Sequence, residues 1–219
     1  MRLVLLGAPG SGKGSLAALL KESLKVSHIS TGDLLREEIK NKTALGQKAK
    51  SYIDQGALVP DELVTALVEN RLKSIEGGYL LDGFPRTKTQ AGDLNKILLS
   101  LKAPLDYAVY LEATLPVIID RLSGRRVCKS CGALYHIRNK PPKKDGVCDL
   151  CGGALYQRPD DNEATVQERM KVYLKSTKPI IRYYQNQNRL VTVNSDQDSD
   201  ELHRAILKLF DEQDKHHHH

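Results

Sequence analysis

The sequence predicts an α/β fold in which a parallel sheet carries helices on both faces. Short apolar runs alternate with longer segments whose apolar residues recur at helical spacing, and this alternation is typical of parallel sheets. The first apolar run leads directly into a glycine-rich loop and a helical pattern, which is the order of a phosphate-binding loop. With 219 residues, the chain is long enough for one such domain with insertions.

The individual strands and helices are predicted from apolar runs and from helical spacing. The apolar run 3–6 forms the first strand, because a strand covered on both faces is continuously apolar. Asp61 is expected to cap a helix that runs to about Ile75, and Pro116 opens another helix. Further strands are predicted at 26–29, 79–82, 107–111 and 190–193, and further helices over Leu16 to Leu24 and Leu202 to Phe210.

The alternation stops between about Val127 and Asp161, where Cys, Gly, Pro and Lys dominate, so this segment is expected to be a small inserted domain. The chain is 40% hydrophobic and 27% charged, as in ordinary globular proteins. The sequence shows neither a leader peptide nor an apolar run of membrane-spanning length, so a cytoplasmic location without a membrane partner is expected. His216 to His219 are interpreted as a purification tag.

The net charge of +6 is compatible with nucleic acid, an acidic membrane or a small polyanionic substrate as the ligand. The arginines are spread among separate motifs instead of forming one basic tail or helix face. This distribution favours several phosphate groups in a cleft over a long nucleic-acid track.

Residues 7–13 have the spacing G-x-x-x-x-G-K directly after the first strand. Such a loop directs backbone N–H groups at phosphates, and Lys13 supplies a mobile ammonium. A glycine-rich surface turn is the alternative. Gly14 stands where a hydroxyl residue usually ligates magnesium, so Mg²⁺ is expected to be held through waters by Ser15, Asp33 and Asp82.

Four cysteines form two C-x-x-C pairs, Cys128 with Cys131 and Cys148 with Cys151, separated by 16 residues. In a chain without a secretion signal, this spacing predicts a structural Zn²⁺ site. Iron fits the same spacing, and two disulfides are the alternative. A glycine follows each second cysteine, as tight metal knuckles require.

Three further segments, 30–36 (STGDLLR), 82–86 (DGFPR) and 121–126 (RLSGRR), together with the loop 7–14 (GAPGSGKG), resemble the adenylate kinase family of the bacterial type with a zinc-binding lid. The resemblance runs from Met1 to the last helix. It implies a core of residues 1–29, 60–125 and 164–215, a helical AMP-binding arm of residues 30–59, and a zinc-ribbon lid of residues 126–163.

The resemblance also implies reversible, Mg²⁺-dependent phosphoryl transfer between ATP and AMP, giving ADP, by a monomer. The implied catalytic cations are Lys13, Arg86, Arg125, Arg158 and Arg169. ATP is expected at Gly10, Ser11, Gly12, Lys13, Gly14, Ser15, Arg121, Arg125, Leu134, Tyr135 and Gln197. AMP is expected at Thr31, Arg36, Ala57, Leu58, Val59, Gly83, Phe84, Pro85, Arg86, Gln90, Arg158 and Arg169.

The chain departs from the family pattern at Ser15 and Leu16, where Thr and Gln are usual, and around Gln197, where the usual glycine is missing. Thr31 and Gln90 favour AMP over other nucleoside monophosphates, which remain an alternative acceptor. A nucleic-acid-binding ATPase that uses the cysteine ribbon is a second alternative, but Pro141, Pro142 and the scarcity of aromatic residues speak against it.

Overall fold

The computed structural model describes the backbone of residues 1–217 and all of their side chains except those of residues 160 and 215–217. Its core is a five-stranded parallel sheet in the order β2-β3-β1-β4-β8. The strands are β1 (Arg2–Gly7), β2 (Ser27–Ser30), β3 (Tyr79–Asp82), β4 (Tyr107–Glu112) and β8 (Leu190–Asn194). The predicted α/β fold is confirmed, and each predicted strand forms to within one residue at either end.

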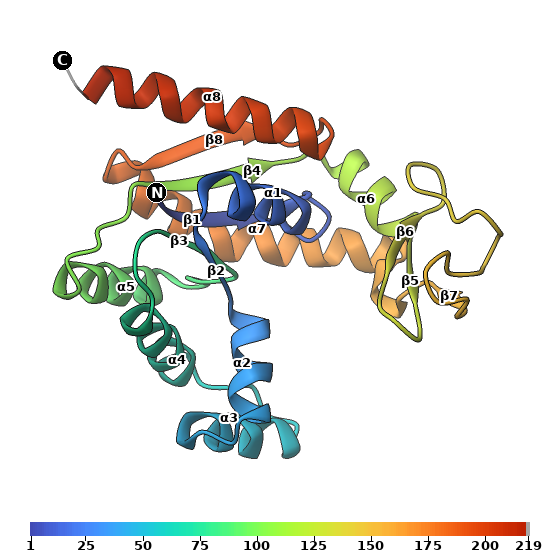
Figure 1. Cartoon of the computed structure of the whole chain (residues 1–219), viewed down its shortest axis with the longest axis horizontal. Coiled ribbons are helices and arrows are strands. Elements are labelled where there is room, and N and C mark those ends of the chain that lie inside the picture. Colours follow the sequence, from blue (N-terminus) through green and yellow to red (C-terminus); the bar gives the residue numbers. More distant parts are fainter. Residues whose placement is uncertain (218–219) are drawn as a thin grey trace.

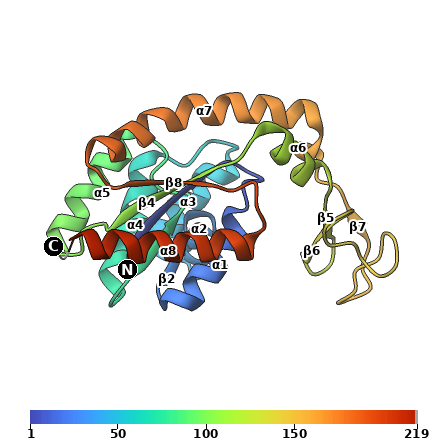
Figure 2. The ribbon, with the colours of Figure 1, turned by 90° about the horizontal axis from the view of Figure 1, so that it is seen from above.

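Helices cover both faces of the sheet because successive side chains of β1 point in opposite directions. Leu3 and Leu5 pack with α1 (Lys13–Leu24) and α8 (Ser199–His217). Val4 and Leu6 belong to the other core cluster, with α4 (Asp61–Ser74), α5 (Lys88–Ser100) and α7 (Glu163–Asn186). Figure 2 shows α7 and α8 on opposite sides of the sheet.

Two helices project from the sheet edge next to β2 (Figure 1). They are α2 (Thr31–Lys40) and α3 (Ala44–Asp54). Thr43 caps α3 by accepting a hydrogen bond from the Gly46 N–H at 3.0 Å. A Cβ atom at Gly46 would lie 2.1 Å from the carbonyl oxygen of Glu38, so the glycine allows α2 and α3 to pack closely.

The inserted segment forms a separate three-stranded antiparallel sheet at the far end of the molecule (Figure 1). It contains β5 (Arg125–Cys128), β6 (Leu134–His136) and β7 (Leu155–Tyr156) in the order β6-β5-β7. Helix α6 (Leu115–Ser123) leads into it, and the short 3₁₀ helix η1 (Pro159–Asp161) leads from it to α7.

Two local predictions need correction or completion. Pro60, not Asp61, is the N-cap of α4; Asp61 and Glu62 occupy the first turn, where their charges complement the helix dipole. Helix α5 and the 24-residue helix α7, which contains Pro179, were not predicted as elements. Of the tag, His216 and His217 continue α8, and His218 and His219 lie outside the described residues. Within the described chain, no helix has both the length and the apolar character of a membrane span.

Candidate active site and metal centre

The glycine-rich loop connects the carboxyl end of β1 to the first turn of α1. Gly10 and Gly12 have φ angles of 83° and 86°, a left-handed conformation that glycine adopts without steric cost. Gly12 is the N-cap of α1 and has no side chain to occupy the N–H groups of the first turn. These groups and the helix dipole make the loop suitable for a phosphate anion.

The side chains of the loop differ in their exposure. Ser11 is completely buried, and a Cβ atom at Gly7 would lie 2.6 Å from its Oγ. Ser11 can therefore offer a ligand its backbone only. Gly14 and Ser15 are exposed in the first turn of α1, where a hydroxyl group can reach solvent or a hydrated cation.

Lys13 forms an ion pair at the carboxyl ends of the central strands. Its Nζ lies 2.9 Å from Oδ1 of Asp82, and Nε2 of His28 lies 3.2 Å from Oδ2 of the same carboxylate. Burial alone would raise the pKa of Asp82, but the hydrogen bond from His28 and the charge of Lys13 together hold it below its ordinary value. Asp82 is therefore ionised at neutral pH. Asp33 lies apart from this cluster, exposed and paired with Arg36.

Two cavities of 510 Å³ each meet at the glycine-rich loop. The inner cavity is lined by the loop, by residues 83–86 and by α7, and it brings together Lys13, Arg86 and Arg169. The lid-side cavity is lined by the other side of the loop and by Arg121, Arg125 and Leu134. Lys13 lines both cavities. Of the five predicted catalytic cations, Lys13, Arg86 and Arg169 thus line the inner cavity. Arg125 lines the lid-side cavity. Arg158 is exposed just before η1.

The segment 83–86 at the inner cavity is held by its own hydrogen bonds. Oε1 of the buried Gln90 accepts a hydrogen bond from the Arg86 N–H at 2.8 Å, and Arg86 Nε donates to the Gly83 carbonyl at 3.0 Å. The hydroxyl of Thr31 lies 3.4 Å from the same carbonyl oxygen. Phe84 is buried and is followed by a cis peptide bond to Pro85. Gln90 and Thr31 therefore contact this loop from two different helices, but neither side chain lines the inner cavity.

The other residues predicted for AMP lie on the projecting helices or just after them. Arg36 and Ala57 are exposed, Val59 is half-buried, and the apolar side chain of Leu58 is 94% exposed. These residues do not line the inner cavity as described. A single exposed apolar side chain is ordinary on a protein surface and carries no argument by itself; Leu150, for example, is 80% exposed.

Arg121 connects the glycine-rich loop to the segment after β8. Its guanidinium donates to the carbonyl oxygens of Gly10 at 3.2 Å, Ser195 at 2.6 Å and Gln197 at 3.1 Å. Burial lowers the pKa of this guanidinium from its ordinary value. The backbone carbonyl of Gln197 accepts from Arg121, and its side-chain amide donates separately to the Asn194 carbonyl at 2.8 Å.

Arg125 is held by a carboxylate that the sequence analysis did not identify. Asp161 is fully buried and accepts two hydrogen bonds from Arg125, at 2.9 Å from Nε and 2.8 Å from Nη2. Nη1 of Arg169 lies 3.9 Å from Oδ1 of Asp161. One carboxylate therefore holds two of the predicted catalytic arginines at the base of the small sheet.

His28 was missed as well. Its position at the end of a strand, before the polar run 30–33, was the available signal for His28, and the acidic pair after Pro159 was the signal for Asp161.

The four cysteines come together at one end of the small sheet. All four are free, and their Sγ atoms lie within 4.8 Å of one another. Cys128 and Cys151 are 3.3 Å apart and Cys131 and Cys148 are 3.6 Å apart, far beyond the ~2.05 Å of a disulfide. A tetrahedron with Zn–S bonds of ~2.3 Å has S–S edges of about 3.8 Å. The arrangement fits a four-coordinate metal site.

The glycine after each second cysteine shapes the turn of its knuckle. Gly132 and Gly152 have φ angles of 76° and 74°, and their N–H groups donate to the carbonyl oxygens of Cys128 and Cys148. The sulfur of Cys128 accepts instead from the N–H groups of Ser130 and Cys131, at 3.4 and 3.5 Å. The glycines thus provide the turn, and their neighbours provide the N–H···S bonds.

The sulfur atoms also show why the cluster suits a cation. The hydroxyl of Tyr135, 3.3 Å from Cys148 Sγ, lowers the pKa of Cys148 to about 6, although burial acts against it. The Gly153 N–H lowers the pKa of Cys151, but the neighbouring sulfur atoms raise it to about 12. Adjacent thiolates repel one another, so all four ionise together only when a cation neutralises them.

Consecutive residues of β6 point to opposite sides of the small sheet. The side chain of Tyr135 is buried against the cysteine cluster, and its hydroxyl also accepts the Asp149 N–H at 2.9 Å. Leu134 is 53% exposed and lines the lid-side cavity. Of this predicted pair, only Leu134 presents its side chain to that cavity, while Tyr135 supports a cysteine ligand.

Comparison with known proteins gives a consistent result over nearly the whole chain. The adenylate kinase family model matches residues 5–189. Adenylate kinases of Caldicellulosiruptor saccharolyticus and Alkaliphilus oremlandii are each 50% identical, over 95% and 94% of this chain and 98% and 97% of their own. That of Bacillus licheniformis is 46% identical over 98% of this chain and 100% of its own.

Proposed function

Since the chain belongs to the adenylate kinase family of nucleoside monophosphate kinases, we propose that it transfers a phosphoryl group reversibly from ATP to AMP, giving two ADP. The observation that carries this proposal is the pair of equal cavities that meet at Lys13. Two nucleotides bound on either side of the glycine-rich loop would place their terminal phosphates beside the same ammonium. Such positioning is the main requirement for phosphoryl transfer.

We assign the inner cavity to AMP. Thr31 and Gln90 reach toward residues 83–86, and both side chains can hydrogen-bond an adenine ring. Besides the Arg86 N–H and the Gly83 carbonyl that they already contact, both side chains keep further hydrogen-bonding capacity, and a base that could not use it would bind less well. Gly83, Phe84 and Pro85 form the wall, and Arg86 supplies a cation. Arg36, Ala57, Leu58 and Val59 would join the site when α2 and α3 approach the core, which would also cover the exposed Leu58.

We assign the lid-side cavity to ATP. Residues 10–15 would hold the phosphates with their N–H groups and Lys13, while Arg121 fixes the loop to residues 195–197. Leu134 and the backbone of Tyr135 would meet the nucleotide as the lid approaches. The carbonyl and amide groups near Gln197 would meet the adenine.

The cations would stabilise charge during transfer. Lys13, Arg86 and Arg169 line the inner cavity, and Arg125 and Arg158 lie at the base of the lid, from which closure would bring them inward. Arginine suits this task because its planar fork binds two phosphate oxygens at once. The attacking AMP phosphate is already ionised, so the reaction requires no general base.

The ionised Asp82, the exposed hydroxyl of Ser15 and the carboxylate of Asp33 have the oxygen chemistry that a hydrated Mg²⁺ ion prefers. Asp82 and Ser15 would hold the ion that accompanies ATP through its water ligands, and Asp33, now paired with Arg36, would join them when α2 approaches the core. Mg²⁺ supplies charge neutralisation on the phosphates.

We further propose that Cys128, Cys131, Cys148 and Cys151 hold a structural Zn²⁺ that stiffens a lid of residues 126–163. Four thiolates leave no open coordination position, so this metal takes no part in the chemistry. Residues 30–59 form the AMP-binding arm in this proposal, and residues 1–29, 60–125 and 164–215 form the core of a cytoplasmic monomer.

The test measures ADP formation from ATP and Mg²⁺ with AMP, GMP, UMP or CMP as the acceptor. Rapid ADP formation with AMP alone supports the proposal. Transfer to another monophosphate would keep the mechanism but refute the roles of Thr31 and Gln90. ATP hydrolysis without transfer to any acceptor would refute the kinase assignment.

A further inference from the structure

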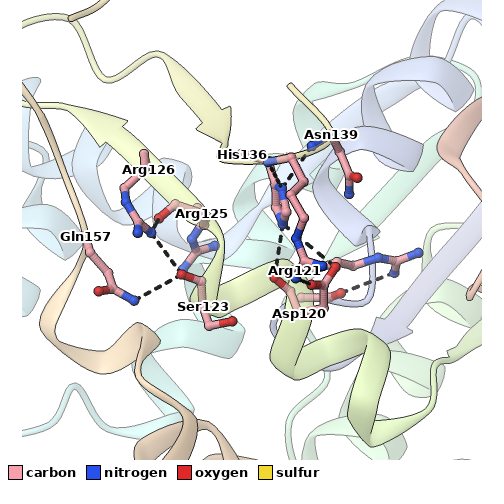
Figure 3. A network of polar contacts seen from close by, with 10 residues as sticks. Asp120, Arg121, Ser123, Arg125, Arg126, His136, Asn139 and Gln157 are labelled. Carbon is pink, nitrogen blue, oxygen red and sulfur yellow. Dashed lines mark hydrogen bonds and ion pairs between the residues drawn. The ribbon is translucent and has the colours of Figure 1, made fainter. Parts of the chain in front are cut away.

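Side chains of the small sheet cap the carboxyl end of α6. The last carbonyl groups of a helix have no partner within it and need donors from elsewhere. The Ser123 carbonyl accepts hydrogen bonds from Arg126 Nη1 at 2.9 Å and from Gln157 Nε2 at 3.1 Å. The Asp120 carbonyl, which already accepts the Gly124 N–H at 3.0 Å, has a second donor in Nε2 of His136, also at 3.0 Å (Figure 3). The small sheet is thereby attached to one helix end.

His136 uses both ring nitrogens in this attachment. Nδ1 accepts the backbone N–H groups of Arg138 at 3.0 Å and Asn139 at 3.1 Å. Because Nδ1 is an acceptor, the proton of the neutral ring is on Nε2, which donates to the Asp120 carbonyl. The ring therefore connects the turn after β6 to α6 and is buried between them, with 9% of the residue exposed.

Gly124 provides the space that this ring occupies. A Cβ atom at Gly124 would lie 2.3 Å from Nε2 of His136, much closer than non-bonded atoms approach. The φ and ψ angles of Gly124 are −84° and −8°, and the non-glycine residues Asn41 and Leu101 have nearly the same angles at the ends of α2 and α5. Glycine is therefore required here for the imidazole and not for the backbone conformation.

The contact between His136 and Gly124 lies next to Arg125, one of the proposed catalytic arginines. His136 is the register partner of Arg125 across β5 and β6, and the Ile137 N–H donates to the Gly124 carbonyl at 2.9 Å. Arg125 and Arg121 lie on either side of Gly124 in sequence, and both line the lid-side cavity. The position of the ring thus fixes where β5, and with it Arg125, leaves α6.

We propose that His136, seated on Gly124, is a positioning residue that sets the pivot of the lid and so places Arg125 for phosphoryl transfer. This inference deepens the function proposed above. His136 touches no reacting atom in this scheme and acts through β5. Replacing His136 should therefore change kcat and the KM for ATP. The KM for AMP should stay nearly the same, because the inner cavity and the arm are built from other elements.

The first test compares His136→Ala with His203→Ala in the full-length, zinc-loaded chain. His203 is a suitable control because its ring contacts Ser23 on the distant α1–α8 surface. We expect kcat to fall about tenfold in His136→Ala, with KM for ATP raised and KM for AMP within twofold, since a misplaced arginine weakens mainly the transition state. His203→Ala should leave all three constants unchanged.

His136→Asn separates the pivot from the local turn. Asparagine can still accept the Arg138 and Asn139 N–H groups but is too short to reach the Asp120 carbonyl. We expect this variant to be as impaired as His136→Ala. Turnover like that of the parent chain would show that His136 serves only the turn, and would overturn the proposal.

The sharper test is a double-mutant cycle between Gly124→Ala and His136→Ala. The added methyl group should cost at least tenfold in kcat when the imidazole is present, and less than twofold when the ring has been removed. Costs that multiply independently would overturn the seating of the ring on Gly124.

A physical measurement keeps this inference separate from the function. Hydrogen exchange at the Arg138 and Asn139 amides should become faster in Gly124→Ala whether or not the chain proves to be a kinase. Unchanged exchange would refute the contact. A parent chain inactive with every acceptor would refute the proposed function and leave the contact standing.

Discussion

Tyr135→Phe tests how the small sheet supports its metal site. The change removes one oxygen atom and keeps the ring that fills the space beside Cys148. In the structure this hydroxyl lies 3.3 Å from Cys148 Sγ and accepts the Asp149 N–H at 2.9 Å. It is also the strongest single influence on the pKa of Cys148, ahead of the backbone N–H groups of Cys151 and Leu150. Without it, the thiolate loses one of three donors and binds a cation less favourably.

The magnitude follows from the number of donors that remain. Loss of an outer hydrogen bond to a metal ligand typically weakens metal binding about 10- to 100-fold. Because two N–H donors stay on Cys148 Sγ, we expect the lower part of this range, roughly 10- to 30-fold in the Kd for Zn²⁺. Competition between the metal-free chain and a chromophoric chelator measures this Kd.

The matched control is Tyr156→Phe in the same sheet. The Tyr156 ring lies at its surface, with Lys129 Nζ 5.6 Å from the ring centroid. Its hydroxyl can be removed without touching a cysteine, and zinc affinity should stay within twofold of the parent value. Equal affinity for Tyr135→Phe and Tyr156→Phe would refute the reasoning, because the hydroxyl would then make no contribution to Cys148.

Three further predictions follow from the same geometry. Zinc affinity should increase with pH between about pH 6 and pH 8, because Cys131 and Cys151 have raised pKa values and must lose protons to bind. The increase should be about tenfold per pH unit for each proton released. Chelator competition at several pH values measures the affinity, and a flat profile would contradict the prediction. Asp161→Asn should lower the free energy of unfolding by about 2–3 kcal/mol, because the amide keeps only part of the paired hydrogen bonding to Arg125; urea denaturation with an unchanged midpoint would contradict it. Lys13→Met should lower kcat about 100- to 1,000-fold through loss of the shared cation; ADP formation at saturating substrate measures it, and a loss below tenfold would argue against a role at both cavities.

The main sheet could be predicted from the sequence because each buried strand is a short, continuously apolar run. The run 3–6 and the run 79–81 are covered by helices on both faces and contain no charged residue, so the pattern indicates buried strands. The cysteine cluster was equally predictable, because two C-x-x-C pairs at this spacing have few other uses. In both cases a local pattern was sufficient.

The features that escaped prediction depend on contacts between distant segments. Asp161 became notable only when folding buried it against Arg125, which is 36 residues away in the chain. The ATP-binding role of Arg121 stays a prediction, but its bonds to three carbonyl groups from two loops could not be foreseen from the sequence. His136 belongs to none of the sequence motifs, yet it is buried and hydrogen-bonded to α6. No spacing rule contains this information.

The two ends of the small sheet leave the core side by side. Val127 pairs with Tyr156, and Gln157 reaches the Ser123 carbonyl at 3.1 Å, so the segment enters and returns at nearly the same place. A segment with adjacent ends can change in length or sequence without moving the strands of the main sheet, since the distance between the two points where it joins the core stays the same. The segment is therefore an interchangeable module: evolution or an engineer could replace the cysteine ribbon with a metal-free one while preserving the few residues that join it to α6.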